Sequence, residues 1–163
     1  MTKPKVYIET SVLSYLAARP SRDAIVYGQQ QLTMTWWESH RQKFVLLVSE
    51  VVIDEAAGGD KSAAKRRLEL LTDAAVLDFN IAAVALAEKL LAKQLVPKRA
   101  ARDAAHIAIA AVHDVDYLLT WNFKHIGNPM LRERINAVIR EAEFRPSVIC
   151  SPGELSGEYR DVE

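Results

Sequence analysis

Cysteine is nearly absent from the sequence, which contains only Cys150 among its 163 residues. A single cysteine excludes an internal disulfide framework and a zinc site built from several cysteines. Cys150 lies in the apolar segment 147–150, where a free cysteine usually behaves as a small buried hydrophobic residue. We therefore expect the chemistry of this protein to come from other side chains.

Long apolar runs are also missing. No stretch approaches the ~20 apolar residues that a membrane-spanning helix needs. Residues 1–5 lead directly into a strand-like segment, without the apolar stretch of a signal peptide. These two absences predict a cytoplasmic protein without a membrane anchor.

The sequence carries no excess of either charge, because Lys plus Arg and Asp plus Glu both total 21. A strongly basic balance would have indicated nucleic-acid binding, whereas a neutral balance does not exclude it. Any phosphate-binding surface must then be local rather than spread over the molecule.

The composition is that of one globular domain, with 50% hydrophobic and 26% charged residues. Apolar runs alternate with amphipathic segments, which predicts an α/β protein whose mainly parallel sheet of four or five strands is covered by helices on both faces. The expected strands are 6–8, 44–48, 76–79, 117–120 and 146–150, and the expected helices are 12–16, 24–41, 49–57, 61–71, 81–93, 101–113 and 131–143. We expect a single domain over residues 1–152 and a loose acidic tail over 153–163.

Acidic and polar residues fall where the predicted strands end. Glu9 directly follows the first strand, Glu55 lies in the helix after the second, and Asn122 follows the fourth. Asp103 opens an alanine-rich helix. Ligands bind off the carboxyl ends of strands in an open parallel sheet, and Mg²⁺ and Mn²⁺ prefer hard oxygen ligands such as carboxylates. The order of these residues therefore predicts a metal site at this edge.

Each residue also has an ordinary structural interpretation. Glu9 fits a solvated glutamate at the end of a strand. Asp103 fits an acid that stabilises a helix N-terminus, and Asn122 fits a turn residue.

The choice of Glu55 within its helix is open on pattern alone. Glu50 and Asp54 are four residues apart and share one face, and Glu55 points about 100° further round. At least two of these three acids must face solvent.

Four stretches of the chain carry a resemblance to a known family. They are Val6–Leu13 (VYIETSVL), Val48–Glu55 (VSEVVIDE), Arg102–Ala108 (RDAAHIA) and Tyr117–Ile126 (YLLTWNFKHI). In this order, and with the last strand at 148–150, they resemble the PIN domain, particularly the VapC-like toxins of bacterial toxin–antitoxin pairs. Only a few residues in each stretch are diagnostic, so the match rests on order and spacing over nearly the whole chain.

The resemblance implies a three-layer α/β/α sandwich that cleaves single-stranded RNA with Mg²⁺ or Mn²⁺. By position, the three acids of the family that hold the metal fall on Glu9, Glu55 and Asp103. The fourth position of the family, Asp or Asn, falls on Asn122, and its small hydroxyl residue falls on Thr10.

Substrate and protein partners follow from the same resemblance. Thr10, Arg102 and Lys124 are candidates to bind or steer the RNA backbone, although each charge is also explained by solvation. The family implies a homodimer and a cognate antitoxin that blocks the site. The neighbours Trp36 and Trp37 cannot both face one core, so an exposed tryptophan at an interface is a further expectation.

The sequence departs from the family at Glu9, where aspartate is usual. Glutamate keeps the charge and moves the carboxylate by roughly an ångström, and a displacement of that size can cost about 100-fold in rate. Either Glu9 still binds metal, or the protein is a catalytically weak PIN-like RNA-binding or regulatory protein. A phosphatase-like or nucleotide-binding α/β domain is a third alternative, but no Gly-rich phosphate loop follows any strand.

Overall fold

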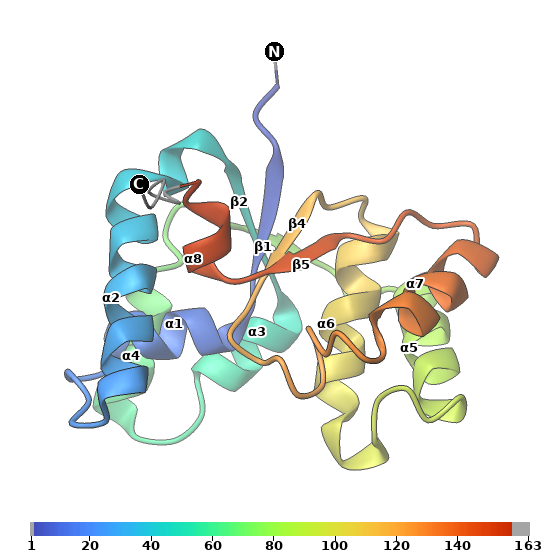
Figure 1. Cartoon of the computed structure of the whole chain (residues 1–163), viewed down its shortest axis with the longest axis horizontal. Helices are drawn as coiled ribbons and strands as arrows, with labels where there is room; N and C mark the ends of the chain where they lie inside the picture. Colours follow the sequence, from blue (N-terminus) through green and yellow to red (C-terminus); the bar gives the residue numbers. More distant parts are fainter. Residues whose placement is uncertain (1, 158–163) are drawn as a thin grey trace, which may run out of the picture.

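The sheet at the centre of the protein has five strands, all parallel, in the order β3-β2-β1-β4-β5 (Figure 1). The computed structural model describes residues 2–157. Its strands are β1 (Lys5–Ile8), β2 (Val45–Ser49), β3 (Ala75–Leu77), β4 (Tyr117–Leu119) and β5 (Val148–Cys150). This confirms the predicted parallel sheet, with β3 and β5 at its two edges.

The central strand β1 is apolar on both faces. Val6, Tyr7 and Ile8 are all buried, as expected for a strand that helices cover on both sides.

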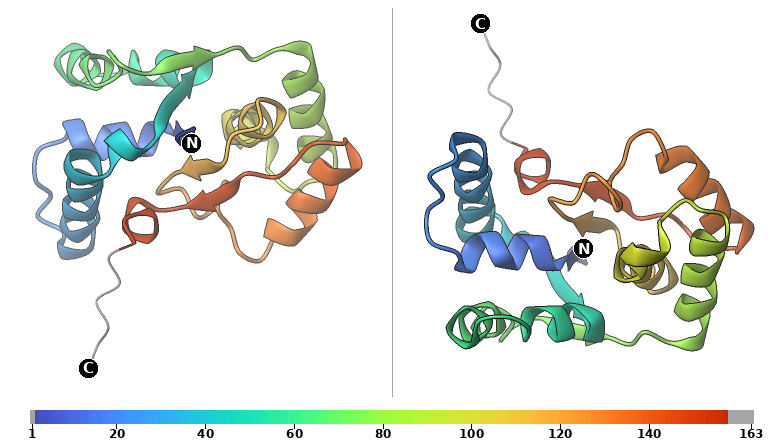
Figure 2. Two further views of the ribbon diagram at one scale, coloured as in Figure 1. Left: turned by 90° about the horizontal axis from the view of Figure 1, so that it is seen from above. Right: turned by 90° about the horizontal axis from the view of Figure 1, so that it is seen from below.

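Helices form a layer on each side of the sheet (Figures 1 and 2), which confirms the α/β/α arrangement. One layer contains α1 (Thr10–Ala17), α2 (Ala24–Ser39) and α4 (Lys61–Glu69), and the other contains α5 (Ile81–Ala92), α6 (Ala101–Val112) and α7 (Arg132–Glu141). The short helix α3 (Glu50–Ala56) follows β2 and contacts both α1 and α6. Within residues 2–157, no helix combines the length and the apolarity needed to span a bilayer.

Side-chain caps fix where several helices begin. Asp23, Ser49 and Asn80 each accept a hydrogen bond from a backbone N–H in the first turn of the helix that follows. The cap at Ser49 matters for function, because it fixes the start of α3, the helix that carries Glu55.

The two adjacent tryptophans of α2 divide between core and surface. Trp36 is fully buried, whereas Trp37 is partly buried and has the Arg41 guanidinium 5.0 Å from its ring centroid. That contact has the geometry of a cation–π interaction. It occupies one face of the less buried ring.

The chain end after β5 differs from the expectation. Ser151 and Glu154 form a capping box, and Pro152 takes the first position of α8 (Pro152–Leu155), a position that proline favours. This helical turn packs against α2. The loose tail that we expected from residue 153 therefore begins with ordered structure, and residues 158–163 lie outside the part that the structure describes.

Candidate active site at the carboxyl edge of the sheet

The carboxyl ends of β1, β2 and β4 meet at one edge, at the bottom of the view in Figure 1. Glu9 leaves β1 there as the N-cap of α1, and the first turn of α6 brings Asp103 to the same edge. The pairing of Ile8 with Leu119 in neighbouring parallel strands places the next residues, Glu9 and Thr120, side by side. The register of the sheet thus positions the first acid.

Glu9 is buried, and hydroxyl groups hold its carboxylate. Oε1 accepts hydrogen bonds from Thr120 Oγ1 at 2.5 Å and Ser11 Oγ at 2.6 Å, and Oε2 accepts one from Ser11 N at 2.9 Å. Bonds to an ionised acceptor are shorter and stronger than neutral ones. The length of the glutamate side chain therefore matters at this position, because its carboxylate connects α1 with the end of β4.

Glu55 points back towards the sheet and binds two partners. Its Oε1 lies 2.9 Å from Thr10 Oγ1, which donates, and 2.5 Å from His106 Nε2. Burial raises the pKa of Glu55, but the hydrogen bond and charge of His106, the Thr10 hydroxyl and the charge of Arg102 outweigh burial and hold the pKa below its ordinary value. Glu55 is therefore an ionised carboxylate.

A buried relay of polar groups continues from Glu55 into the core. His106 Nδ1 lies 2.6 Å from the Tyr7 hydroxyl, which lies 2.7 Å from Ser49 Oγ. His106 Nε2–H donates to Glu55, and the hydroxyls of Tyr7 and Ser49 can each donate or accept, so all four groups are hydrogen-bonded. Burial raises the pKa of Tyr7 far above its ordinary value, so the phenol stays neutral.

Asp103 has a different environment. Burial and the charge of Glu9 raise the pKa of Asp103, whereas a hydrogen bond to Asn122 and the charges of His106 and His125 lower it. The raising effects are larger, so the pKa lies above its ordinary value. The surrounding groups therefore stabilise the ionised form of Asp103 less than they stabilise the ionised form of Glu55. Asn122 itself is fixed by accepting the His125 N–H on its Oδ1 at 3.0 Å.

An open cavity of about 590 Å³ lies beside these acids, and we call it the acidic hollow. It is lined by Glu55, Arg99, Ala100, Ala101, Arg102, Asp103 and His125. It is the space in which a substrate would reach Asp103 and Glu55.

The donor set partly fits a divalent cation. Carboxylates and an amide oxygen are the ligands that Mg²⁺ and Mn²⁺ prefer, and an acid with a raised pKa near a second negative charge is one that a cation would stabilise. However, residues 2–157 contain no group of three acidic, histidine or cysteine side chains close enough to ligate one ion as they stand. The chemistry fits, and the distances would have to shorten on binding.

The remaining predicted site residues have defined positions. Thr10 donates to Glu55 rather than to Glu9. Arg102 forms an exposed ion pair with Asp54, with 2.7 Å between Nη2 and Oδ2, and Lys124 is exposed two residues beyond Asn122.

Five contacting residues were not among the predicted site residues: Tyr7, Ser11, Ser49, Thr120 and His106. The hydroxyls of Tyr7, Ser49 and Thr120 lie in or at the end of apolar strand segments, where they look like ordinary strand residues. The usable signal was spacing, because His106 lies three residues after Asp103 in α6.

Solved structures with a similar arrangement are VapC proteins. One is VapBC2 from Rickettsia felis, solved with a DNA fragment from the VapBC2 promoter. It superposes with a TM-score of 0.52 at 14% identity, over 90% of this chain and 97% of that chain. VapC20 from Mycobacterium tuberculosis, a sarcin–ricin loop cleaving toxin, gives a TM-score of 0.54 at 16% identity, over 77% of this chain and 95% of that chain. The protein has a VapC-like PIN fold.

No family model matches the sequence, and no curated protein matches it at a significant level. The relation to VapC is therefore carried by the fold. The PIN fold predicted from the four sequence stretches is confirmed, whereas the roles of Glu9, Glu55, Asp103 and Asn122 in catalysis stay predictions.

Proposed function

We propose that this VapC-like protein is a metal-dependent endoribonuclease that hydrolyses phosphodiester bonds in single-stranded RNA, as the toxin of a toxin–antitoxin pair. The observation that carries the proposal is the meeting of Glu9, Glu55, Asp103 and Asn122 at one edge of a PIN sheet, beside an open hollow. A cytoplasmic location, a homodimer and a cognate antitoxin belong to the same proposal as predictions from the sequence.

In this proposal Glu9, Glu55 and Asp103 hold Mg²⁺ or Mn²⁺. The bound ion would lower the pKa of a water molecule and neutralise charge on the scissile phosphate. Asp103 borders the hollow and is less well compensated than Glu55, so it is the acid expected to gain most from the ion. Asn122 holds the Asp103 carboxylate through its hydrogen bond.

Residues of the chain position these ligands and the RNA. Ser11 and Thr120 fix Glu9, while Thr10 and His106 fix Glu55. Thr10 is therefore better placed to orient Glu55 than to bind a phosphate directly. Preorganised ligands reduce the rearrangement that the reaction requires.

The basic residues near the site would contact the RNA backbone. Arg99 and Arg102 line the acidic hollow, and Lys124 lies beyond Asn122. Because Arg102 is paired with Asp54, part of its charge is already compensated. Backbone affinity would therefore be modest and sensitive to salt.

The deciding experiment is cleavage of labelled single-stranded RNA by purified protein with Mn²⁺, and with EDTA in its place. We expect Asp103→Asn to lower the rate by about 100-fold or more. Asp116→Asn is the matched control, because Asp116 directly precedes β4 and so lies at the amino end of the sheet, away from the site. Cleavage that survives Asp103→Asn or EDTA would reject the proposed site.

A catalytically weak RNA-binding or regulatory protein is the second candidate, and the Glu9 side chain favours it. Both Glu9 oxygens already accept hydrogen bonds, so the carboxylate must leave partners to bind metal. RNA binding by the wild-type protein without any cleavage in Mn²⁺ would support this candidate over the nuclease.

A further inference from the structure

A second hollow adjoins the acidic hollow and shares part of its wall. We call it the apolar groove. It is open, has a volume of about 360 Å³, and is lined by Glu50, Val51, Asp54, Phe79, Ala101, Arg102 and Ala105. Ala101 and Arg102 line both hollows. A chain molecule bound at the acids could therefore extend directly into the groove.

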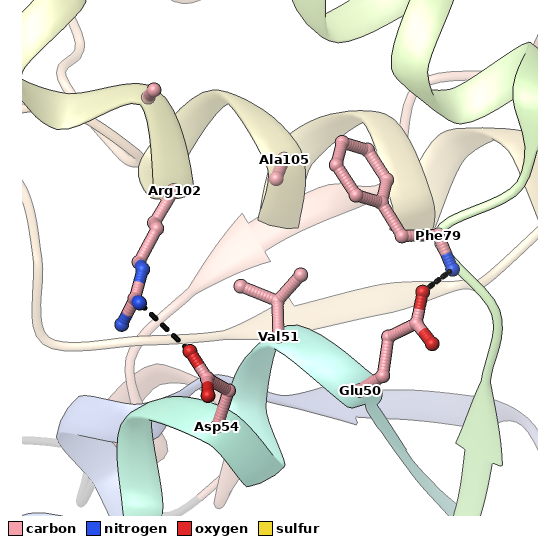
Figure 3. Close-up of a pocket in the computed structure, with 7 residues that line it drawn as sticks. Glu50, Val51, Asp54, Phe79, Arg102 and Ala105 are labelled. Atoms are coloured by element: carbon pink, nitrogen blue, oxygen red, sulfur yellow. Dashed lines mark hydrogen bonds and ion pairs between the residues drawn. The ribbon is translucent and has the colours of Figure 1, made fainter. Parts of the chain in front are cut away.

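The groove has an apolar middle between two polar ends. Figure 3 shows Val51 and Ala105 facing each other from α3 and α6, with the ring of Phe79 beside them. The pair of Arg102 and Asp54 lies at one end, and Glu50 lies at the other. An aromatic face next to small apolar side chains suits a flat ring.

The polar ends offer hydrogen-bond acceptors. Glu50 Oε1 accepts the Phe79 N–H at 2.9 Å, and Asp54 Oδ2 accepts from Arg102 Nη2 at 2.7 Å. Within residues 2–157 the structure gives the second carboxylate oxygen of each acid no hydrogen-bond partner. Two acceptors are thus available at the rim.

The charge of this rim decides which part of RNA it suits. Glu50 and Asp54 repel a phosphate, and the one cation, Arg102, is already paired. A nucleobase is uncharged and has a face that stacks on an aromatic ring. Adenine, cytosine and guanine also carry an exocyclic amino group, whereas uracil donates only through its ring N3–H. Carboxylates accept hydrogen bonds from such amino groups.

We propose that the apolar groove is a subsite for one nucleobase of the RNA substrate, adjacent to the scissile linkage, and that it prefers adenine, cytosine or guanine over uracil. Phe79 stacks on the base, and the free oxygens of Glu50 and Asp54 accept from its amino group. This inference rests on the proposed RNA-cleaving function and adds the specificity of the same site.

Binding is the first test, because it does not depend on turnover. The probes are hexauridylate and three hexanucleotides with a single central adenine, cytosine or guanine, measured with the Asp103→Asn protein in Mg²⁺ so that they stay intact. We expect the three substituted probes to bind at least about fivefold more tightly than hexauridylate. All four bases can stack, so this difference comes from hydrogen bonds of the amino group to a carboxylate, each worth roughly tenfold in affinity.

Two sets of variants connect that preference to the groove. Phe79→Leu keeps apolar volume and removes the aromatic face, and we expect it to weaken the binding of all four probes about fivefold or more, because every base can stack. Tyr27→Leu is the control, since Tyr27 is an exposed aromatic residue on α2 that does not line the groove. Glu50→Gln and Asp54→Asn should reduce the preference without removing stacking, and they test the groove even if Phe79→Leu does not fold.

The outcomes separate the two proposals. If the wild-type protein cleaves RNA but the Asp103→Asn protein binds all four probes equally, or keeps its preference in both Glu50→Gln and Asp54→Asn, the subsite is overturned and the nuclease stands. A preference that depends on Glu50 and Asp54, in a protein that cleaves no RNA, supports the subsite and overturns the nuclease. A groove that binds a protein side chain instead shows no discrimination among bases, which also overturns the subsite.

Discussion

Acidic residues lie at both the amino and the carboxyl ends of the strands. The groups that balance their negative charge differ between the two ends. At the amino end, Arg145 donates to Asp114 and Asp116 at 2.9 and 3.0 Å, and the backbone N–H of Lys5 donates to Asp116 at 2.8 Å. At the carboxyl end, Glu9 has hydroxyls and an N–H as its partners, while Asp103 has an amide. A cation contacts both acids at the amino end, whereas the hydrogen-bond partners of Glu9 and Asp103 at the carboxyl end are neutral groups.

The pKa directions follow this difference. The Lys5 N–H and the Arg145 guanidinium outweigh burial and hold the pKa of Asp116 below its ordinary value. Burial and the charge of Glu9 raise the pKa of Asp103. Acids at the amino end thus stabilise the fold, while the carboxyl end retains a charge imbalance that a bound cation would relieve.

The largest expected effect is that a metal ion stabilises the folded protein by binding at the carboxyl end of the sheet and not at the amino end. Mn²⁺ at a hundred times its dissociation constant adds about 2.7 kcal/mol to the free energy of unfolding, which raises the melting temperature by roughly 5–11 °C in a chain of this size. Thermal denaturation with and without EDTA measures it. The shift should vanish in Asp103→Asn and persist in Asp116→Asn, and a shift that persists in both would place the ion elsewhere.

Next in size is the effect of Tyr7→Phe on the buried relay. The change removes the hydroxyl between His106 and Ser49 and leaves two buried polar groups short of a partner. We expect a loss of about 1–3 kcal/mol in the free energy of unfolding, measured by urea denaturation. Tyr27→Phe on the exposed face of α2 is the control. Equal stability of the two variants would mean that the relay does not hold the site together.

A smaller effect is expected for Glu9→Asp, which gives the residue usual in PIN domains. Aspartate can still cap α1, but its shorter side chain would not span the distance to Thr120. We expect a loss of about 0.5–1.5 kcal/mol, the net value of one hydrogen bond, in chemical denaturation. Thr120→Val tests the same bond from the other side, and an additive double mutant would show that the two residues are uncoupled.

The smallest effect concerns the exposed ion pair of Asp116. Its lowered pKa means that its contribution to stability is present above the unfolded pKa of about 3.9 and is lost as pH falls through the folded value. Asp116→Asn should therefore cost about 0.2–1 kcal/mol at pH 7 and nothing at pH 2, as measured by melting in both buffers.

Asp103→Asn, measured by melting in the same two buffers, should change stability in a different way from Asp116→Asn. A raised pKa means that the stability contribution of Asp103 is present at low pH and lost as pH rises through its folded value. Neutralising Asp103 should then leave stability at pH 7 unchanged or higher. A loss larger than that of Asp116→Asn would contradict the difference drawn between the two ends.

Sequence patterns predicted the sheet well because short apolar runs alternate with amphipathic segments along the chain. Asp103 was identifiable because a carboxylate among alanines in a buried helix is unusual. Thr120 could not be assigned to Glu9, because that contact depends on the pairing of β1 with β4 across more than a hundred residues. Nor could spacing show that Arg102 pairs with Asp54, or that α8 begins where a loose tail was expected.

The pairing of the last strand has a consequence for synthesis. The backbone N–H of Thr120 donates to the carbonyl of Cys150 at 3.0 Å, so β5 holds the residue whose hydroxyl fixes Glu9. On the ribosome the chain emerges from its N-terminus, and β4 is an edge strand until residue 150 is free to join it. The strand that holds Thr120 in place is therefore available only after residue 150 has left the ribosome, and a chain cut before β5 would lack it.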